Sequence, residues 1–266
     1  MTTTVTVLDR VHVVAHPSSR EIRSRHSVVL LHGIGGGATS CGPLAARLAA
    51  AGLDCWCPDA PGYGRSADPR PGIGPVEEMA ELIEALVPGE PVVLLGTSWG
   101  GVIAMDLALH RPDLVAALVI ADSTRGSGVT AERAAGMLAR IPDLVDRGAA
   151  AVAADRADAL TAPDCDPAVT AEVRATMAEV REPGFAAAAR YMAATDLGPD
   201  LARLARPALV LVGERDTITG VDESRLLADE IPGAQLRIVP DAGHAAIQEQ
   251  PDVVAGHVLD FVGMLS

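Results

Sequence analysis

Ser98 has the clearest chemical setting in the sequence. It stands at the centre of Gly96-Thr97-Ser98-Trp99-Gly100, a G-x-S-x-G pattern, with the apolar segment PVVLL before it and the helical pattern GVIAMDLALH after it. In this strand–turn–helix setting the turn holds the serine at positive φ, so the residues two positions away must be small. The pattern predicts a nucleophilic serine at the carboxyl end of a buried strand; a glycine-rich turn of an inert sheet is the alternative.

A serine hydroxyl is a poor nucleophile at neutral pH and needs a base within hydrogen-bond reach. Among the seven histidines, His244 has the most suitable place. It follows the apolar segment AQLRIV on a loop, and loops beyond the carboxyl ends of strands form the crevice of a parallel sheet. The other histidines lie on polar turns, an edge strand, helices or a glycine loop: His12, His16, His26, His32, His110 and His257. His244 is therefore the predicted general base.

A base of this kind needs a carboxylate that fixes its tautomer and stabilises the imidazolium. Asp216 closes the segment ALVLVGERD, and Asp122 closes LVAALVIAD, so each follows an apolar strand pattern. The strand of Asp216 is the one that precedes the strand of His244, so both loops should emerge at the same edge of the sheet. We predict Asp216 as the acid, with Asp122 as its rival.

The segment HGIGGG, residues 32–37, follows the apolar run SVVLL and can offer backbone N–H groups to a tetrahedral intermediate. Its consecutive glycines would let that intermediate approach the backbone closely. The predicted oxyanion-hole donors are the N–H of Ile34 in this loop and the N–H of Trp99, directly after the nucleophile.

The same loop has a second interpretation as a dinucleotide-binding fingerprint. Gly33, Gly35 and Ala38 satisfy its looser form, G-x-G-x-x-A. Such a fingerprint opens a helix within the motif, with the pyrophosphate on the helix N-terminus. Here the helical pattern begins only near Pro43, which disfavours a nucleotide site.

Composition excludes several classes of protein. The 21 basic and 35 acidic residues give a net charge of −14, which opposes binding to nucleic acid or to an anionic membrane. The sequence has no Lys and no Asn, which excludes Schiff-base lysines, pyridoxal enzymes, Walker-type loops and a Cys-His-Asn triad. The cysteines are expected to be reduced structural thiols, because no further ligands stand at metal-binding spacing: Cys41, Cys55, Cys57 and Cys165. We expect neither metal nor cofactor.

The beginning of the chain, MTTTVTVLDRVHVV, lacks the basic and apolar regions of a signal peptide. No apolar run reaches the length of a membrane span. The sequence therefore predicts a cytoplasmic protein that acts on a small molecule. Its oligomeric state is open, and a homo-oligomer is compatible with the sequence.

The elements around these residues alternate between apolar strands and helices, which predicts a mostly parallel α/β sheet of about eight strands with helices on both faces. The expected strands are a pair within 4–14 and single strands at 27–31, 53–57, 91–96, 114–121, 208–213 and 235–239. The expected helices are 43–51, 76–86, 101–110 and 251–265.

Residues 123–204 interrupt this alternation. They contain no apolar strand run and are rich in Ala, Arg, Asp and Glu at helical spacing. We predict an inserted helical cap over a core domain of residues 1–122 and 205–266. The alternative is a set of additional surface helices within the α/β layers.

Together these motifs resemble the α/β-hydrolase fold family, in particular its cap-bearing esterases, lactonases and C–C hydrolases. The resemblance rests on HGIGGG, DAPGYGRS at 59–66, GTSWGG at 96–101, GERD at 213–216 and DAGH at 241–244, which span most of the chain. The order Ser98, Asp216, His244 is that of the family's catalytic triad. Related dehalogenases and epoxide hydrolases carry Asp at the position of Ser98, which argues against both activities.

The resemblance implies a serine hydrolase that cleaves a carboxylic ester or lactone through an acyl-enzyme. Hydrolysis of a C–C bond in a β-diketone, of an enol-lactone or of a thioester uses similar machinery and is an alternative. A ligand-sensing module that keeps the triad but turns over slowly is a second hypothesis. Candidate substrate-binding residues are Trp99, Met137, Tyr191 and Met192, although core packing is the other role open to the methionines.

Overall fold

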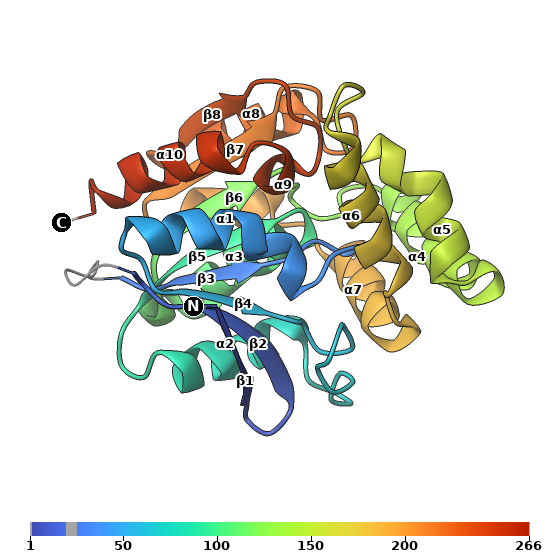
Figure 1. Cartoon of the computed structure of the whole chain (residues 1–266), viewed down its shortest axis with the longest axis horizontal. Helices are drawn as coiled ribbons and strands as arrows, with labels where there is room; N and C mark the ends of the chain where they lie inside the picture. The colour runs from blue at the N-terminus through green and yellow to red at the C-terminus, as the bar shows by residue number, and fades with distance from the viewer. Residues whose placement is uncertain (1, 20–25, 266) are drawn as a thin grey trace.

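The computed structural model describes residues 2–19 and 26–265. Its described strands form one eight-stranded sheet (Figure 1), and the prediction of a mostly parallel sheet is confirmed. The first two strand pairs, β1–β2 and β2–β4, are antiparallel and the remaining pairs are parallel. In spatial order the strands are β1 (Thr3–Val7), β2 (Val11–His16), β4 (Cys55–Pro58), β3 (Val28–Leu31), β5 (Val92–Thr97), β6 (Val115–Ala121), β7 (Ala208–Gly213) and β8 (Gln235–Val239).

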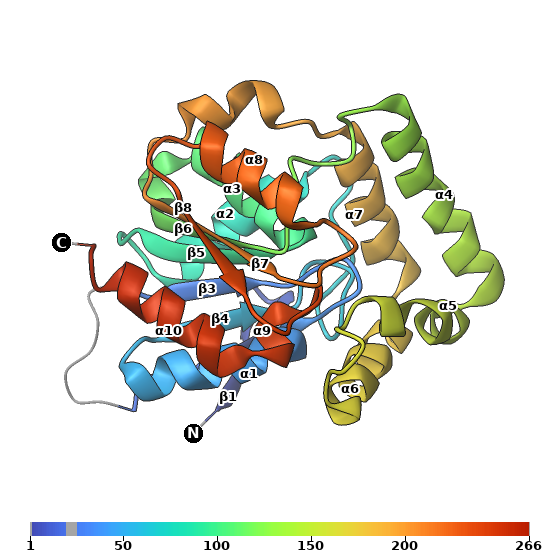
Figure 2. The ribbon, with the colours of Figure 1, turned by 90° about the horizontal axis from the view of Figure 1, so that it is seen from above.

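Helices cover both faces of the sheet, as Figure 2 shows from above. One face carries α1 (Ala38–Ala51), α9 (Ala246–Glu249) and α10 (Pro251–Val262); the other carries α2 (Pro75–Leu86), α3 (Trp99–His110) and α8 (Val221–Glu230). Because successive side chains of a strand point to opposite faces, Leu94 packs toward α2 and α3, whereas Val93 and Leu95 pack toward α1 and α10. All six residues of β5 are buried, which explains its continuous apolar sequence.

Helix α1 begins at Ala38, five residues before the position that the sequence pattern indicated. Gly42 and Pro43 are weak helix formers and suggested a later start, yet both lie inside the helix. The N–H of Ala38 donates to the Asp59 carboxylate at 2.8 Å, a partner that is distant in the sequence and supplies what a local cap would otherwise supply. Helix α8 was not expected, because it buries only Ser224 and Leu227 and so has little apolar periodicity.

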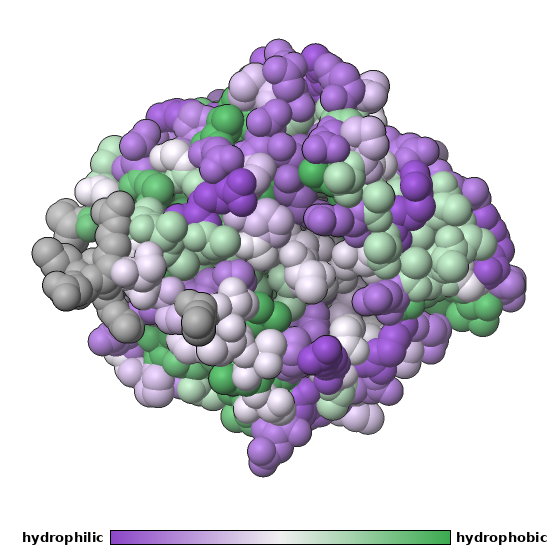
Figure 3. Space-filling view, in the orientation of Figure 1, coloured by the Kyte–Doolittle hydropathy of each residue, from purple (hydrophilic) through white to green (hydrophobic). Residues whose placement is uncertain are grey.

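The segment between β6 and β7 is helical, and its four α-helices lie beyond the carboxyl ends of the strands, at the right of Figure 1. Its helices are α4 (Ala131–Arg147), α5 (Ala149–Arg156), α6 (Pro167–Ala178) and α7 (Glu182–Ala194). The same segment contains two short 3-10 helices, η2 (Ala157–Ala159) and η3 (Gly198–Arg203). A third, η1 (Pro112–Leu114), directly precedes β6. The pale green surface over α5 in Figure 3 reflects its exposed alanines; hydrophilic side chains lie to its right and more hydrophobic ones below it. No helix in residues 2–19 and 26–265 is long and apolar enough to cross a membrane.

Helix α4 is expected to open more readily than the sheet. Only Leu144 of its 17 residues is buried, whereas every residue of β5 is buried, and segments with few buried apolar contacts unfold locally at low cost. Amide hydrogen exchange followed by mass spectrometry should therefore be faster across residues 130–194 than across β5. Equal protection of the two regions would contradict this expectation.

Candidate active site

Ser98 lies in a strained turn between β5 and α3. Its backbone has φ 53° and ψ −120°, a conformation that few non-glycine residues adopt. Its N–H donates to the carbonyl of Ala121 at 2.9 Å. A Cβ atom on Gly96 would lie 2.2 Å from the Gly100 carbonyl oxygen, and one on Gly100 would lie 2.4 Å from that of Leu31. The predicted positive φ and the need for small neighbours are therefore both confirmed.

His244 and Asp216 form a buried pair. His244 Nδ1 lies 3.0 Å from Asp216 Oδ2, and the Asp216 side chain is fully buried. The carboxylate also accepts hydrogen bonds from the Thr219 hydroxyl and from the N–H groups of Ile218 (2.7 Å) and Thr219 (3.1 Å). Burial alone would raise the pKa of Asp216, but His244 and these donors lower it to about 2. The carboxylate is therefore ionised at neutral pH and accepts the Nδ1 proton of His244, which leaves Nε2 free to accept a proton.

Close backbone packing brings the loops of these two residues together. A Cβ atom on Gly213 would lie 2.0 Å from the Gly243 carbonyl oxygen, so only glycine fits beside the loop of His244. The Arg215 N–H donates to the carbonyl of Ala242 at 2.8 Å and links the two loops directly.

Glu249 holds the His244 loop from the other side. Its Oε1 accepts from the N–H groups of Gly243 (2.9 Å) and Ala245 (3.2 Å), and its Oε2 accepts from the N–H of Ala162 (2.7 Å). Glu249 was not among the predicted site residues, because nothing in the local sequence indicates a hydrogen bond to a segment 87 positions away.

Asp122, the rival acid, has a different role in the structure. It is completely buried, adopts φ 47° and accepts a hydrogen bond from the Gly213 N–H at 2.8 Å. Burial and the nearby negative charge of Asp216 raise its pKa well above the ordinary range. Among the described residues, the carboxylate that pairs with His244 is that of Asp216.

The glycine loop lies against Ser98. A Cβ atom on Gly33 would be 3.3 Å from the Ser98 Cβ, which brings the Ile34 backbone to the same place. In the part of the chain that the structure describes, neither the Ile34 nor the Trp99 N–H donates to a protein atom. Trp99 is the first residue of α3, and the first N–H groups of a helix have no partner within it. Both N–H groups are therefore free to bind an oxyanion.

Helix α1 begins directly after the glycine loop and not near Pro43, so its starting point does not disfavour a nucleotide site. The start of this helix is already occupied by groups of the protein. Asp59 accepts the Ala38 N–H at 2.8 Å, and the Ser40 hydroxyl accepts the Gly37 N–H at 3.3 Å. A carboxylate at this helix N-terminus opposes the binding of a pyrophosphate.

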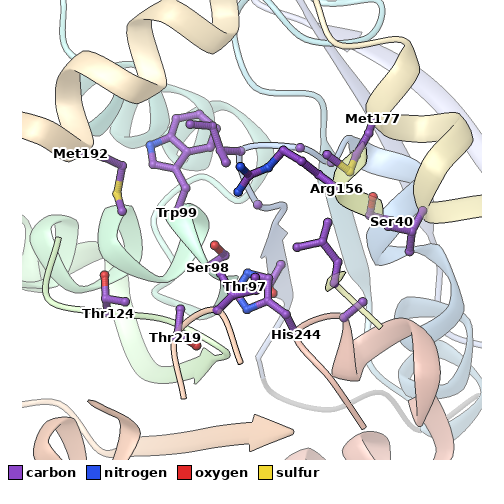
Figure 4. A pocket seen from close by; sticks show the side chains of 18 of the residues that line it. Ser40, Thr97, Ser98, Trp99, Thr124, Arg156, Met177, Met192, Thr219 and His244 are labelled. Atoms are coloured by element: carbon purple, nitrogen blue, oxygen red, sulfur yellow. The ribbon is translucent and has the colours of Figure 1, made fainter. Parts of the chain in front are cut away.

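A cavity of about 250 Å³ is lined by Ser98, His244 and the glycine loop, and Figure 4 shows part of its lining. Of the four predicted substrate-binding residues, Trp99, Met137 and Met192 line it. Tyr191 does not, which corrects the prediction: its hydroxyl donates to Asp106 at 2.6 Å, on α3. Adjacent residues of a helix point about 100° apart, so Met192 can face the cavity while Tyr191 faces α3.

Several lining residues had no signal in the sequence. Met177 of α6 reaches the glycine loop, where a Cβ atom on Gly35 would be 3.2 Å from its Cγ. Three arginines of the helical segment also line the cavity: Arg133, Arg140 and Arg156. Their helices, α4 and α5, contain many charged residues, so the sequence does not distinguish these arginines from ones that face solvent. The cysteines are unpaired, and the described residues contain no group of His, Cys, Asp and Glu side chains that could hold a metal.

Comparison with known proteins agrees with the fold and the motifs. A family model described as the alpha/beta hydrolase family matches residues 28–257. The pimeloyl-[acyl-carrier protein] methyl ester esterase of Aromatoleum aromaticum is 29% identical over 255 residues, covering 90% of this chain and 99% of that protein. The 3-oxoadipate enol-lactonase 2 of Acinetobacter baylyi is 25% identical over 203 residues, covering 73% of each chain.

A solved thermophilic esterase from Thermogutta terrifontis has the same fold. It superimposes with a TM-score of 0.86 at 24% identity, covering 100% of this chain and 99% of that chain. The sequence match, the strand order and the turn that carries Ser98 point to one conclusion: this chain belongs to the alpha/beta hydrolase family.

Proposed function

We propose that this protein is a serine hydrolase that cleaves a carboxylic ester or lactone of a small molecule. The observation that carries the proposal is the buried His244–Asp216 pair, which opens on the same cavity as the strained Ser98. The esterase and enol-lactonase among the relatives support the same reaction class. Residues 123–204 act as a cap in this proposal, because α4, α6 and α7 contribute Met137, Met177 and Met192 to the cavity.

The first half of the reaction forms an acyl-enzyme. Ser98 Oγ attacks the carbonyl carbon while His244 Nε2 accepts the hydroxyl proton. The negative charge that develops on the carbonyl oxygen is stabilised by the Ile34 and Trp99 N–H groups. The ionised Asp216 stabilises the imidazolium and keeps Nε2 directed at the reaction. The bond to the leaving alkoxide then breaks, and His244 returns the proton to it.

In the second half, water takes the place of Ser98 as the attacking group, and Ser98 Oγ becomes the leaving group. A water molecule gives its proton to His244 Nε2 and attacks the acyl carbon, and the same N–H groups bind the second oxyanion. Collapse of this intermediate breaks the bond to Ser98 Oγ, which recovers its proton from His244. The acid is released and the free enzyme is restored, so no residue is consumed.

Turnover of short p-nitrophenyl esters tests the proposal directly. A hydrolase should turn over at roughly 1–10³ per second, the range typical of enzymes, and activity should depend on Ser98. A rate of about one turnover per minute or less on esters and lactones alike would overturn the proposal in favour of a ligand-sensing module.

Covalent labelling should identify the nucleophile. Phenylmethylsulfonyl fluoride is expected to modify Ser98 alone, because only a serine with an adjacent base reacts readily. Intact mass and peptide mapping would locate the adduct, with Ser98→Ala as the control. Labelling that persists in Ser98→Ala would contradict the assignment.

Asp216→Asn should lower kcat by about 10⁴-fold, as the loss of a triad aspartate does in serine proteases. The N–H groups of Ile218 and Thr219 require an oxygen at one end of the side chain, so the new NH₂ would face His244 Nδ1. His244 Nδ1 must then accept a hydrogen bond from this NH₂ group, so the ring proton moves to Nε2. A protonated Nε2 cannot act as a base toward Ser98.

The matched control is Asp122→Asn, the same substitution in a neighbouring buried acid. It should lower kcat by less than about tenfold, because the amide keeps an acceptor for the Gly213 N–H. Single-turnover acylation would separate the two variants, with melting curves to verify folding. If Asp122→Asn lost the activity and Asp216→Asn kept it, the acid would be Asp122.

The pH dependence of stability should report on Asp122. Its pKa is raised in the folded chain, so the stability it contributes is complete below the unfolded pKa of about 3.9 and is lost as pH rises through the folded value. Asn does not titrate, and it tolerates positive φ. The melting temperature of Asp122→Asn relative to the unsubstituted protein should therefore rise as the pH increases above about 4. A difference that stays constant or falls with pH would contradict the buried, neutral acid.

A further inference from the structure

Two arginines that line the cavity have no anionic partner among the residues that the structure describes. Most described arginines lie within ion-pair distance of a carboxylate, and Arg133, also at the cavity, lies 4.0 Å from Glu223. In the described part of the chain, no carboxylate lies within 4.0 Å of Arg140 or Arg156. This is unexpected in a protein with 35 acidic residues and a net charge of −14.

Arg140 is held in place by contacts that leave its charge uncompensated. Its guanidinium carbon lies 5.2 Å from the centre of the Phe185 ring, and its Nη1 lies 3.5 Å from the sulfur of Met137. Burial and the positive charge of Arg156 lower its pKa to about 10, so it is still protonated at neutral pH. Burying a cation without a counter-ion is costly, which makes such a group a strong site for an anion.

Arg156 directs a second positive charge into the same space. It lies in the last turn of α5, where the helix dipole favours a cation. Figure 4 shows its guanidinium directed into the cavity, with Ser98 between it and His244 in that view. The repulsion between Arg140 and Arg156 is relieved when both share one anion.

We propose that Arg140 and Arg156 bind an ionised carboxylate of the substrate, separate from the ester or lactone group that Ser98 attacks. This inference rests on the proposed function and names its substrate class: monoesters or lactones of dicarboxylic acids. A guanidinium offers two parallel N–H donors that match a carboxylate. Met137, Met177 and Met192 would contact the methylene groups between the two ends of the substrate.

The kinetic test compares acyl chains of equal carbon number that end either in a carboxylate or in a methyl group. The p-nitrophenyl monoesters of succinate, glutarate and adipate are paired with the p-nitrophenyl esters of butanoate, pentanoate and hexanoate. The unsubstituted protein should prefer at least one charged ester by about 10- to 100-fold in kcat/KM, the effect expected of hydrogen bonds to a charged group. Arg140→Gln and Arg156→Gln should each lose most of this preference while hydrolysing the neutral esters within about threefold of the original rate.

Two further variants serve as controls. Arg147→Gln removes the same charge from α4 at a surface position that is paired with Asp143 at 3.2 Å, and it should keep the preference. Arg140→Lys keeps the charge but loses the planar pair of donors, so it should retain a reduced preference. A preference that survives both glutamine substitutions, or that falls equally in Arg147→Gln, would overturn the proposal.

A binding measurement separates this inference from the reaction itself. Calorimetry with the Ser98→Ala protein should show monomethyl glutarate binding more tightly than dimethyl glutarate, and Arg140→Gln or Arg156→Gln in that background should remove the difference. Equal affinity for the two compounds would overturn the carboxylate site, even if neutral esters are hydrolysed. Selective binding without hydrolysis of any ester would keep the carboxylate site and contradict the proposed function instead.

Discussion

The hydrogen bond between His244 Nδ1 and Asp216 Oδ2 joins two loops that follow different strands, and it is strongest while the buried Asp216 is ionised. Burial opposes that charge. The Ile218 and Thr219 N–H groups and the Thr219 hydroxyl offset the penalty, because each donates to the carboxylate. The loop after β7 therefore provides both the acid and the donors that keep it charged.

The sheet makes this arrangement rigid. Strands β5, β6 and β7 are almost wholly buried and carry Val, Leu, Ile and Ala, so the carboxyl ends of these strands have little freedom to move. Glycines then allow the backbones at those ends to approach closely: Gly96 and Gly100 at the turn of Ser98, and Gly213 beside the loop of His244. The positions of Ser98 and His244 are therefore set in part by close backbone packing.

Much of this arrangement was predictable, because its signals are local. The apolar patterns at 208–213 and 235–239 predicted β7 and β8 with the correct bounds. The G-x-S-x-G pattern indicated the strained turn of Ser98. The features that escaped prediction depend on contacts distant in sequence. The start of α1 is set by Asp59, the loop of His244 is held by Glu249, and whether an arginine of α4 or α5 faces solvent or the cavity depends on how the helices pack. The prediction that Tyr191 lines the cavity was wrong for the same reason, because its partner Asp106 belongs to another helix.

Glu249 has one carboxylate oxygen on the loop of His244 and the other on Ala162, which belongs to the helical segment between β6 and β7. A single side chain thus connects the loop of His244 to the helical segment. Displacement of the chain around Ala162 would deprive the buried Ala162 N–H of its acceptor, Glu249 Oε2. It would also release one end of the side chain that holds the loop of His244. The position of the His244 loop is therefore coupled to that of the helical segment through Glu249, because a shift of either one changes the hydrogen bonds that this side chain makes with the other.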